Sequence, residues 1–235
     1  MIKIDLLLAT LITYKARTEN DNYIVMSDGN KKLKGNSRIS FLIWNLPAVI
    51  TCPYRTNNCE RFCYATKAEK AYPDCLPART RNFEMSRRPD FVDRMIYTIK
   101  VELDRPKNKN KKIVFRIHES GDFYNKAYVD KWLSIIRHFE NDNRIVFVAY
   151  TKSVKYFDGV DIPANMALLA SVWDDTKRSN LDIIARNNFR IYTAYKGEQL
   201  DNAIKSGFAR CRCEDCATCG LCWNNYVNNV CCEIH

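Results

Sequence analysis

The sequence lacks an apolar run long enough to cross a bilayer. Its best candidate, Ile4–Ile12 (IDLLLATLI), is much shorter than the roughly 20 residues that a membrane-spanning helix needs. No cleavage signature of a secretory signal follows that run. We therefore expect a cytoplasmic protein that does not associate with a membrane.

Cysteine is absent between positions 76 and 210, although the chain contains eleven of these residues. Four lie between positions 52 and 75, five between 211 and 222, and the last two are Cys231 and Cys232. A disulfide framework usually belongs to a small secreted domain with an even number of cysteines. An odd, clustered set in a chain of 235 residues that is 46% apolar instead favours metal ligation, because thiolates suit zinc and iron–sulfur clusters.

Acidic residues are too few to balance the basic ones, and the formal net charge is +10. Much of the positive charge lies in two short runs, residues 31–34 (KKLK) and 107–112 (KNKNKK). Such a balance favours polyanionic partners, including nucleic acid. The runs are equally typical of solvated loops, and no arginine-rich helix or known nucleic-acid-binding module accompanies them.

Apolar β-rich runs alternate with amphipathic stretches from about position 40 onward. The predicted strands are Ala48–Thr51, Ile113–Ile117, Arg144–Tyr150, Met166–Val172 and Phe189–Ala194. The predicted helices are Pro77–Leu103, interrupted at Arg88-Pro89, then Lys126–Phe139, Lys177–Arg186 and Glu198–Ser206. This alternation predicts an α/β fold of parallel βα units, arranged as a partial (β/α) barrel or as an open doubly wound sheet. We expect an N-terminal extension over 1–40, a catalytic βα-repeat domain over 41–208 and a cysteine-rich metal-binding tail over 209–235.

Polar and sulfur-bearing side chains follow the ends of the predicted strands. The segments concerned are Cys52–Cys63, His118–Phe123, Thr151–Ser153, Trp173–Asp175 and Tyr195–Lys196. Loops after the carboxyl ends of parallel strands build the ligand sites of such folds. We therefore expect all five segments to converge on one face and to form an active site around a metal.

The first cysteine group, Cys52, Cys59 and Cys63, has the spacing C-x6-C-x3-C. A structural zinc site usually has four ligands in two C-x2-C pairs, and neither gap here matches that pattern. Cys75 is the nearest candidate for a fourth ligand. Three thiolates without a fourth suit a [4Fe-4S] cluster with one iron open to a substrate or cofactor.

This arrangement resembles the radical S-adenosylmethionine superfamily, in which three cysteines follow the first strand of a partial barrel and an aromatic residue precedes the last one. Phe62 holds that aromatic place, although both gaps depart from the usual C-x3-C-x2-C spacing. The resemblance implies a [4Fe-4S] cluster, S-adenosylmethionine, and an electron donor such as flavodoxin or ferredoxin. Phe62 and Tyr64 would line the adenine, and the loop Glu119-Ser120-Gly121-Asp122 would meet the amino acid part.

Structural roles are alternatives for the same side chains. Phe62 and Tyr64 are also typical of core aromatic residues. His118 is favoured as a hydrogen-bonded structural residue over a ligand, and Glu119 and Asp122 can cap the following helix. Lys152 is a further candidate for cofactor binding, or a solvated lysine.

A second resemblance is to a phage and mobile-element family, the gene product 88-like proteins. The segments that carry it are Leu46-Pro47, Thr51-Cys52-Pro53, Cys59, Cys63-Tyr64-Ala65, Arg116–Phe123 and Tyr150–Ser153. They cover roughly positions 46 to 153. This resemblance implies family membership and no particular activity.

The C-terminal tail carries Cys213, Cys216, Cys219 and Cys222 in C-x2-C-x2-C-x2-C spacing. The run resembles the cysteine run of bacterial ferredoxins, without the x3 gap and the proline that follow there. An auxiliary iron–sulfur cluster is favoured over zinc. Zinc remains an alternative if Cys231, Cys232 or His235 completes the ligand set, and Cys211 is a further unassigned thiol.

These features predict an iron–sulfur enzyme of the radical S-adenosylmethionine type that acts on an unknown substrate. Two alternatives remain: a zinc-stabilised nucleic-acid-binding protein, and a non-catalytic iron–sulfur redox protein.

Overall fold

The computed structural model describes residues 22–212, 214–224 and 229–234. Three features named above, Ile4–Ile12, Cys213 and His235, lie outside these residues. Within the described ranges, no helix has the length and apolar character needed to cross a membrane.

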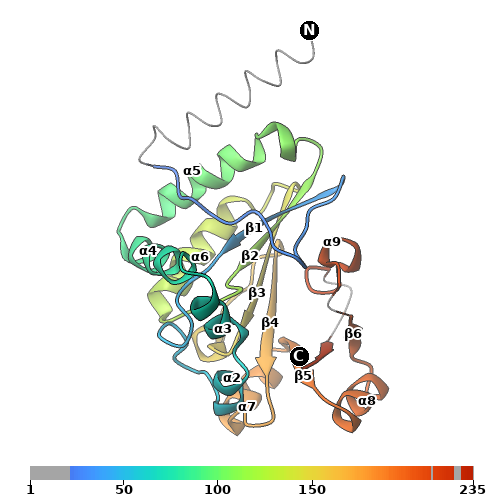
Figure 1. Cartoon of the computed structure of the whole chain (residues 1–235). Helices are drawn as coiled ribbons and strands as arrows, with labels where there is room; N and C mark the ends of the chain where they lie inside the picture. The colour runs from blue at the N-terminus through green and yellow to red at the C-terminus, as the bar shows by residue number, and fades with distance from the viewer. Residues whose placement is uncertain (1–21, 213, 225–228, 235) are drawn as a thin grey trace.

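Seven parallel strands form one curled half-barrel sheet with helices packed around it (Figure 1). The strands are β1 (Ile39–Trp44), β2 (Lys112–Ile117), β3 (Ile145–Thr151), β4 (Met166–Val172), β5 (Arg190–Tyr195), β6 (Ala209–Cys211) and β7 (Val230–Glu233). Their order in the sheet is β1-β2-β3-β4-β5-β7-β6, and each neighbouring pair is parallel. The predicted α/β fold of parallel βα units is confirmed.

The helices of the described residues follow the predicted pattern after the first loop. They are α2 (Asn57–Arg61), α3 (Tyr64–Ala71), α4 (Cys75–Arg87), α5 (Phe91–Leu103), α6 (Lys126–His138), α7 (Arg178–Arg186), α8 (Glu198–Lys205) and α9 (Cys216–Cys219). The predicted interruption at Arg88-Pro89 separates α4 from α5. Arg88 is extended, with ψ 149°, because a following proline disfavours helical backbone at the residue before it.

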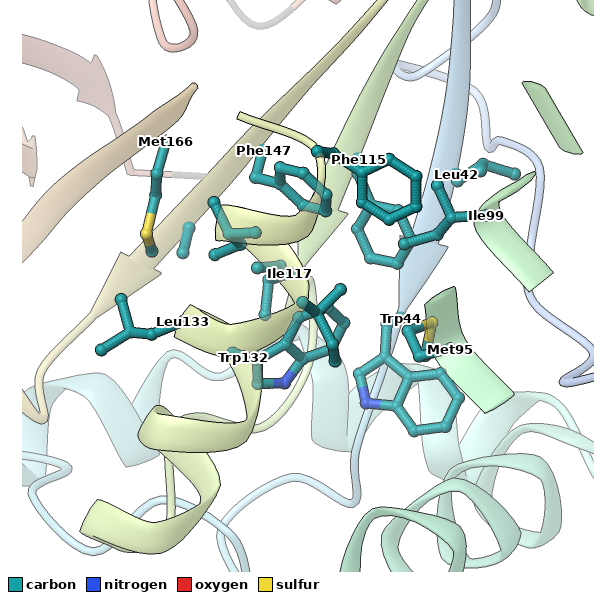
Figure 2. Packing of buried hydrophobic residues seen from close by; sticks show 14 of the residues in the cluster. Leu42, Trp44, Met95, Ile99, Phe115, Ile117, Trp132, Leu133, Phe147 and Met166 are labelled. Atoms are coloured by element: carbon teal, nitrogen blue, oxygen red, sulfur yellow. The ribbon is translucent and has the colours of Figure 1, made fainter. Parts of the chain in front are cut away.

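One face of the sheet carries the largest apolar core, beneath α5 and α6 (Figure 2). Alternate residues of β2 and β3, such as Phe115 and Phe147, meet Trp132 of α6 and Ile99 of α5 in that core. All four of these side chains are at most 1% exposed. The 2-residue period of the strands and the 3.6-residue period of the helices thus direct apolar side chains to one layer.

The prediction that Ala48–Thr51 ends the first strand is wrong. The strand stops at Trp44, and residues 48–51 form a turn in which Val49 has φ 66°. The Thr51 hydroxyl donates to the Pro47 carbonyl (2.7 Å), and the Cys52 amide donates to the Val49 carbonyl (3.1 Å). These local hydrogen bonds satisfy the backbone without a neighbouring strand, so an apolar, β-branched run folds back as a loop.

The last two strands reverse the direction in which the sheet grows. The chain adds β1 to β5 in order, places β6 one strand further out, and then returns to insert β7 between β5 and β6. Parallel strands are joined by right-handed connections, so a connection that runs backward must cross the opposite face. The described residues of the cysteine-rich segment between β6 and β7, such as Cys216 and Cys222, accordingly pack on the face away from α5 and α6, which we call the inner face.

The described part of the N-terminal region, residues 22–40, packs against the main body. Ile24 is 4% exposed, and its amide donates to the Thr98 hydroxyl on α5 (2.8 Å). Ser27 and Ile43 form an antiparallel bridge beside β1. The N-terminal and C-terminal segments therefore both contribute contacts to the single sheet.

Candidate functional site

Three half-buried cysteines lie together at the carboxyl end of the sheet. Cys52 follows the turn after β1, Cys59 lies within α2, and Cys63 immediately precedes α3. Cys59 and Cys63 lie close enough to Cys52 to contribute to its raised pKa. We call Cys52, Cys59 and Cys63 the loop cysteines.

The short helix that carries Cys59 is fixed at its beginning by two acceptors. The Thr56 hydroxyl caps α2 by accepting from the Cys59 amide (3.2 Å). A carboxylate oxygen of Asp175, in the loop after β4, accepts from the Asn58 amide (2.8 Å). Two loops that are 117 residues apart in the chain are thus joined beside Cys59.

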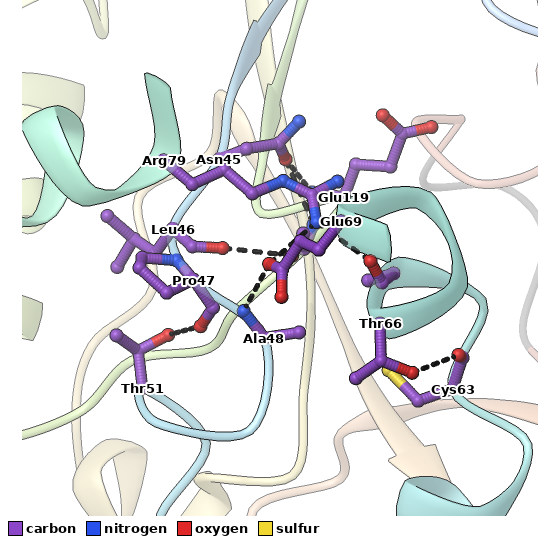
Figure 3. Close-up of polar contacts among 12 residues, drawn as sticks. Asn45, Leu46, Pro47, Ala48, Thr51, Cys63, Thr66, Glu69, Arg79 and Glu119 are labelled. Carbon is purple, nitrogen blue, oxygen red and sulfur yellow. Dashed lines mark hydrogen bonds and ion pairs between the residues drawn. The ribbon is translucent and has the colours of Figure 1, made fainter. Parts of the chain in front are cut away.

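An ion pair between Glu69 and Arg79 joins the segments that precede and follow the loop cysteines (Figure 3). The Glu69 carboxylate of α3 accepts from the Ala48 amide and from Arg79 of α4, each at 2.8 Å. Arg79 also donates to the Ala65 carbonyl (3.0 Å). The turn before Cys52 and the helix after Cys63 are therefore attached to the same carboxylate.

Burial dominates the electrostatics of the loop cysteines. It raises the pKa of Cys52 to about 12, with a further contribution from the carboxylate of Asp122. Burial also raises the pKa of Cys59, and the ammonium of Lys152 opposes that shift. Without a bound cation these two thiols are protonated at neutral pH.

Lys152 is buried beside Cys59, to which its ammonium donates a hydrogen bond. The same ammonium donates to the Ser171 hydroxyl (2.6 Å) and lies 5.8 Å from the centre of the Trp173 ring. Burial lowers the pKa of Lys152, whereas neighbouring Cys59 and Asp122 raise it. Its burial shows that it is not a solvated surface lysine.

Asp122 is buried with its acceptor oxygens occupied. It accepts from the Thr151 hydroxyl (2.6 Å) and from the amides of Lys152 (2.9 Å) and Phe123 (2.7 Å). Burial raises the pKa of this carboxyl, and those hydrogen bonds oppose the shift. Asp122 thereby joins the loops after β2 and β3, directly beside Cys52.

Ser120 and Gly121 contact the loop after β1. The Ser120 hydroxyl donates to the Leu46 carbonyl (2.9 Å), and the Leu46 amide donates back to the Ser120 carbonyl (2.9 Å). Gly121 has φ +83°, and a Cβ there would lie 2.6 Å from both the Leu46 Cβ and the Thr51 hydroxyl. The glycine allows the loop after β2 to contact the loop after β1, with no room left between them.

The remaining predicted cofactor contacts lie on the exposed side of the site. Phe62 is 38% exposed and stacks on Trp173, with ring centres 5.9 Å apart and planes 3° apart. Tyr64 is 56% exposed and donates to the Glu119 carbonyl, while the Glu119 carboxylate accepts from Asn30. Neither aromatic residue is a core residue.

His118 is a buried structural residue. Its Nε2 lies 2.9 Å from the Tyr128 hydroxyl, and burial lowers the pKa of the imidazole to about 3. The backbone at His118 has φ 62°, where the strand turns into the loop. The imidazole packs against Phe123 rather than entering the cysteine group.

Four of the five predicted segments meet at this site. Contacts described above join four segments: Cys52–Cys63, His118–Phe123, Thr151–Ser153 and Trp173–Asp175. Tyr195–Lys196 leads into α8, whose Gln199 donates to Asp174 (3.3 Å). Cys75 is the first residue of α4.

A second group of cysteines lies on the inner face. We call its members, Cys211, Cys216, Cys219 and Cys222, the tail thiols. Cys216, Cys219 and Cys222 lie near Cys211, the last residue of β6, and Arg116 of β2 is close to Cys216 and Cys222. Cys231 and Cys232 are buried in β7. No disulfide joins two of the ten described cysteines.

The comparison with protein families matches residues 19–225 to the model described as gene product 88. The chain belongs to the gene product 88 family. The match extends well beyond positions 46–153, where the resemblance was visible in the sequence.

Two relatives are the Gene 88 proteins of Mycobacterium phages D29 and L5. The D29 protein is 28% identical over 193 residues, which is 74% of this chain and 78% of the phage protein. The L5 protein is 28% identical over 200 residues, which is 76% of this chain and 80% of the phage protein. No solved structure matches the chain.

The description of the gene product 88 family names no metal. In the described part of the chain, no three His, Cys, Asp or Glu side chains could hold a metal ion as they stand. The loop cysteines nevertheless fit a thiolate site in chemistry and place, since they are close together, half-buried and beside one ammonium group.

Sequence reasoning did not select two residues of these sites, Ser171 and Arg116. Ser171 anchors Lys152, and it lies within an apolar strand. Arg116 interrupts the otherwise apolar end of β2 (KIVFRI). A charged residue in a strand that is covered on both faces is the signal that would have identified Arg116.

Proposed function

We propose that this protein is an iron–sulfur enzyme of the radical S-adenosylmethionine type that acts on an unknown substrate. The observation that carries the proposal is the meeting of three half-buried thiols, Cys52, Cys59 and Cys63, at the carboxyl end of a parallel half-barrel. Ligand sites of parallel α/β folds are built at that edge.

The loop cysteines offer one thiolate too few to saturate a [4Fe-4S] cluster. One iron would remain for S-adenosylmethionine, and the cluster would supply the electron that cleaves this cofactor reductively. Each thiol loses its proton when it binds iron. The Lys152 ammonium beside Cys59 favours that loss, because it stabilises a thiolate.

The cofactor is expected on the exposed side of the loop cysteines. The cavity beside Lys152, lined also by Ser171 and Tyr54, has a volume of about 10 Å³, which is room for about one water. Phe62 and Tyr64 are exposed and can contact an adenine. The Glu119 carboxylate is the acceptor of the loop that we assign to the ammonium of S-adenosylmethionine.

Ser120, Gly121 and Asp122 act in this proposal as positioning residues. Their hydrogen-bonding groups and their space are already used to hold the loops together. They would therefore support the cofactor site through the geometry of the loops. Lys152 would contact the cluster through Cys59.

Anaerobic metal and sulfide analysis, combined with electron paramagnetic resonance, tests the proposal. Reduced protein reconstituted with iron and sulfide should show a cluster signal that changes when S-adenosylmethionine is added. Cys52→Ala, Cys59→Ala, Cys63→Ala protein should lose that signal, and Cys75→Ala protein should keep it. A cluster signal that does not change when S-adenosylmethionine is added supports the redox-protein alternative. Protein that binds zinc and no iron supports the nucleic-acid-binding alternative.

A further inference from the structure

The connection between β6 and β7 places four thiols over one patch of the inner face. Cys211 ends β6, while Cys216 and Cys219 are the first and last residues of α9. Cys222 follows in the next turn. Cys211, Cys216 and Cys222 all pack against the apolar cluster that contains Val114 and Val148 of the sheet.

The four thiols also lie within electrostatic range of one another. The Cys219 thiol and Cys211 share a hydrogen bond. Cys216 lies within electrostatic range of the other three, and its pKa is raised to about 12, first by burial and then by Cys222 and Cys211. The group therefore gathers sulfur atoms from a strand, a helix and a turn.

Backbone contacts hold this group in place from both sides. The Cys216 amide donates to the Lys32 carbonyl (3.1 Å) in the segment before β1. The Arg190 guanidinium of β5 donates to the carbonyls of Leu221 (2.9 Å) and Cys222 (3.3 Å). Trp223 packs edge-on against Phe41 of β1, with ring centres 5.6 Å apart.

A half-buried cation lies beside the thiols on the sheet. The Arg116 guanidinium lies 3.5 Å from the centre of the Tyr150 ring, and its Nε is buried with no hydrogen-bond acceptor in the described part of the chain. Its charge reaches Cys216 and Cys222. The Tyr150 hydroxyl makes a hydrogen bond with Cys222. A buried donor without an acceptor is costly, and an anionic group in front of Arg116 would remove that cost.

We infer that Cys211, Cys216, Cys219 and Cys222 draw together on binding into a four-thiolate site for zinc or an iron–sulfur cluster, since as they stand no three of the described side chains are arranged to hold a metal ion. Binding replaces the four thiol protons, which pass to the solvent, by four sulfur–metal bonds. The thiolates leave the site with net negative charge, which Arg116 offsets from the sheet. The hydrogen bond from Tyr150 to Cys222 orients one ligand.

This ligand set differs from the one that regular spacing suggests. The C-x2-C repeat selects Cys213, which lies outside the described residues. Among the described thiols, Cys211 is the one that joins Cys216, Cys219 and Cys222. The bound metal would fasten the β6–β7 connection to the inner face. The inference does not depend on the proposed function, because it involves none of the loop cysteines.

The test uses the full-length chain with Cys52→Ala, Cys59→Ala and Cys63→Ala, so that the tail is measured alone. Metal-free protein is titrated with Co²⁺ and, separately, reconstituted anaerobically with iron and sulfide. We expect one Co²⁺ per chain with strong thiolate-to-cobalt absorption, or iron with sulfide. Retention of iron and sulfide identifies a cluster, and selective uptake of zinc identifies a zinc site.

Two matched variants separate the ligand sets. Cys211→Ser should abolish the four-thiolate spectrum, and Cys213→Ser should leave it unchanged. Tyr150→Phe keeps the packing and should weaken Co²⁺ binding about 10-fold. Circular dichroism confirms that each variant is folded. Absence of metal binding, loss of the spectrum in Cys213→Ser but not in Cys211→Ser, or unchanged affinity in Tyr150→Phe would each overturn the inference.

Discussion

Gly121 shows how closely the loops at the carboxyl end of the sheet fit together. Gly121→Ala should lower the free energy of unfolding by about 2–4 kcal/mol, because the new methyl group meets Leu46 and Thr51 at 2.6 Å in a left-handed backbone. Gly207→Ala is the matched control, since Gly207 has φ +91° and nothing lies within 4 Å of its added Cβ. The control should lose about 1–2 kcal/mol. Urea unfolding of both variants measures the difference, and equal losses would contradict the packing role.

His118 makes the stability of the fold depend on pH. Its pKa is about 3 in the folded protein and about 6.5 ordinarily, so the unfolded chain binds the proton first as the pH falls. Its stabilising contribution is complete above pH 6.5 and is lost between pH 6.5 and about 3.

The matched pair for this prediction is His118→Asn and His138→Asn. Asparagine tolerates the φ of 62° at position 118, and removing the imidazole should flatten the pH slope by up to about 1.4 kcal/mol per unit. His138 is exposed at the end of α6, and His138→Asn is the control for replacing a histidine outside the core. Urea unfolding from pH 7 to pH 4 is the measurement. A wild-type slope in His118→Asn would show that another group is responsible.

At the residue scale, the spacing of Cys52, Cys59 and Cys63 predicts a metal site, and the place of Lys152 after a strand predicts a cofactor contact. The structure places Lys152 beside Cys59, and the ligand roles of the three cysteines stay predictions. The burial of Lys152 and the engagement of Asp122 with Thr151 arise from loops that are distant in sequence. Patterns within one segment contain no information about such contacts.

At the scale of elements, α2 depends on a neighbour from another loop. Asp175 accepts from the Asn58 amide at the beginning of this helix, close to Cys59. Asp175→Ala should therefore loosen α2, at a local cost of about 1 kcal/mol, and weaken metal binding by the loop cysteines about 10-fold.

Asp174→Ala is the control for the neighbouring carboxylate, which accepts from Gln199 at an exposed position. Competition with a chelator, followed by iron analysis, compares the two variants. Equal iron retention would show that Asp175 does not position the cysteine loop.

The predicted strands and helices from position 77 onward agree with the structure because their periodic patterns are long and clear. Ala48–Thr51 failed because a short apolar run has the same pattern in a strand and in a turn. Trp44 and the residues before it are apolar too, and pairing of β1 with β2 decides which run joins the sheet. β6 and β7 were missed because three or four residues are too few to show a period.

At the scale of the whole molecule, the order of the first five strands follows from the alternation of strands and helices. The return of β7 between β5 and β6 does not follow from it, because both arrangements have the same local pattern. This return carries the tail thiols to the inner face. It also explains why their partners Arg116 and Tyr150 come from strands in the middle of the chain.

The loop cysteines and the tail thiols should behave as two independent metal sites. Replacing all three loop cysteines by alanine should remove one site and leave the tail site loaded, because no described thiol belongs to both groups. Iron, zinc and sulfide per chain measure the outcome. Complete loss of metal, or no loss, would contradict two separate sites.

Formation of 5′-deoxyadenosine from S-adenosylmethionine tests whether this protein is an enzyme of the radical S-adenosylmethionine type. Reconstituted protein is reduced with dithionite under anaerobic conditions and incubated with S-adenosylmethionine, and the products are separated by liquid chromatography. We expect slow formation of 5′-deoxyadenosine even without a substrate, and none in the variant that lacks the three loop cysteines. Protein with a complete cluster that neither binds S-adenosylmethionine nor yields 5′-deoxyadenosine would contradict the proposed function.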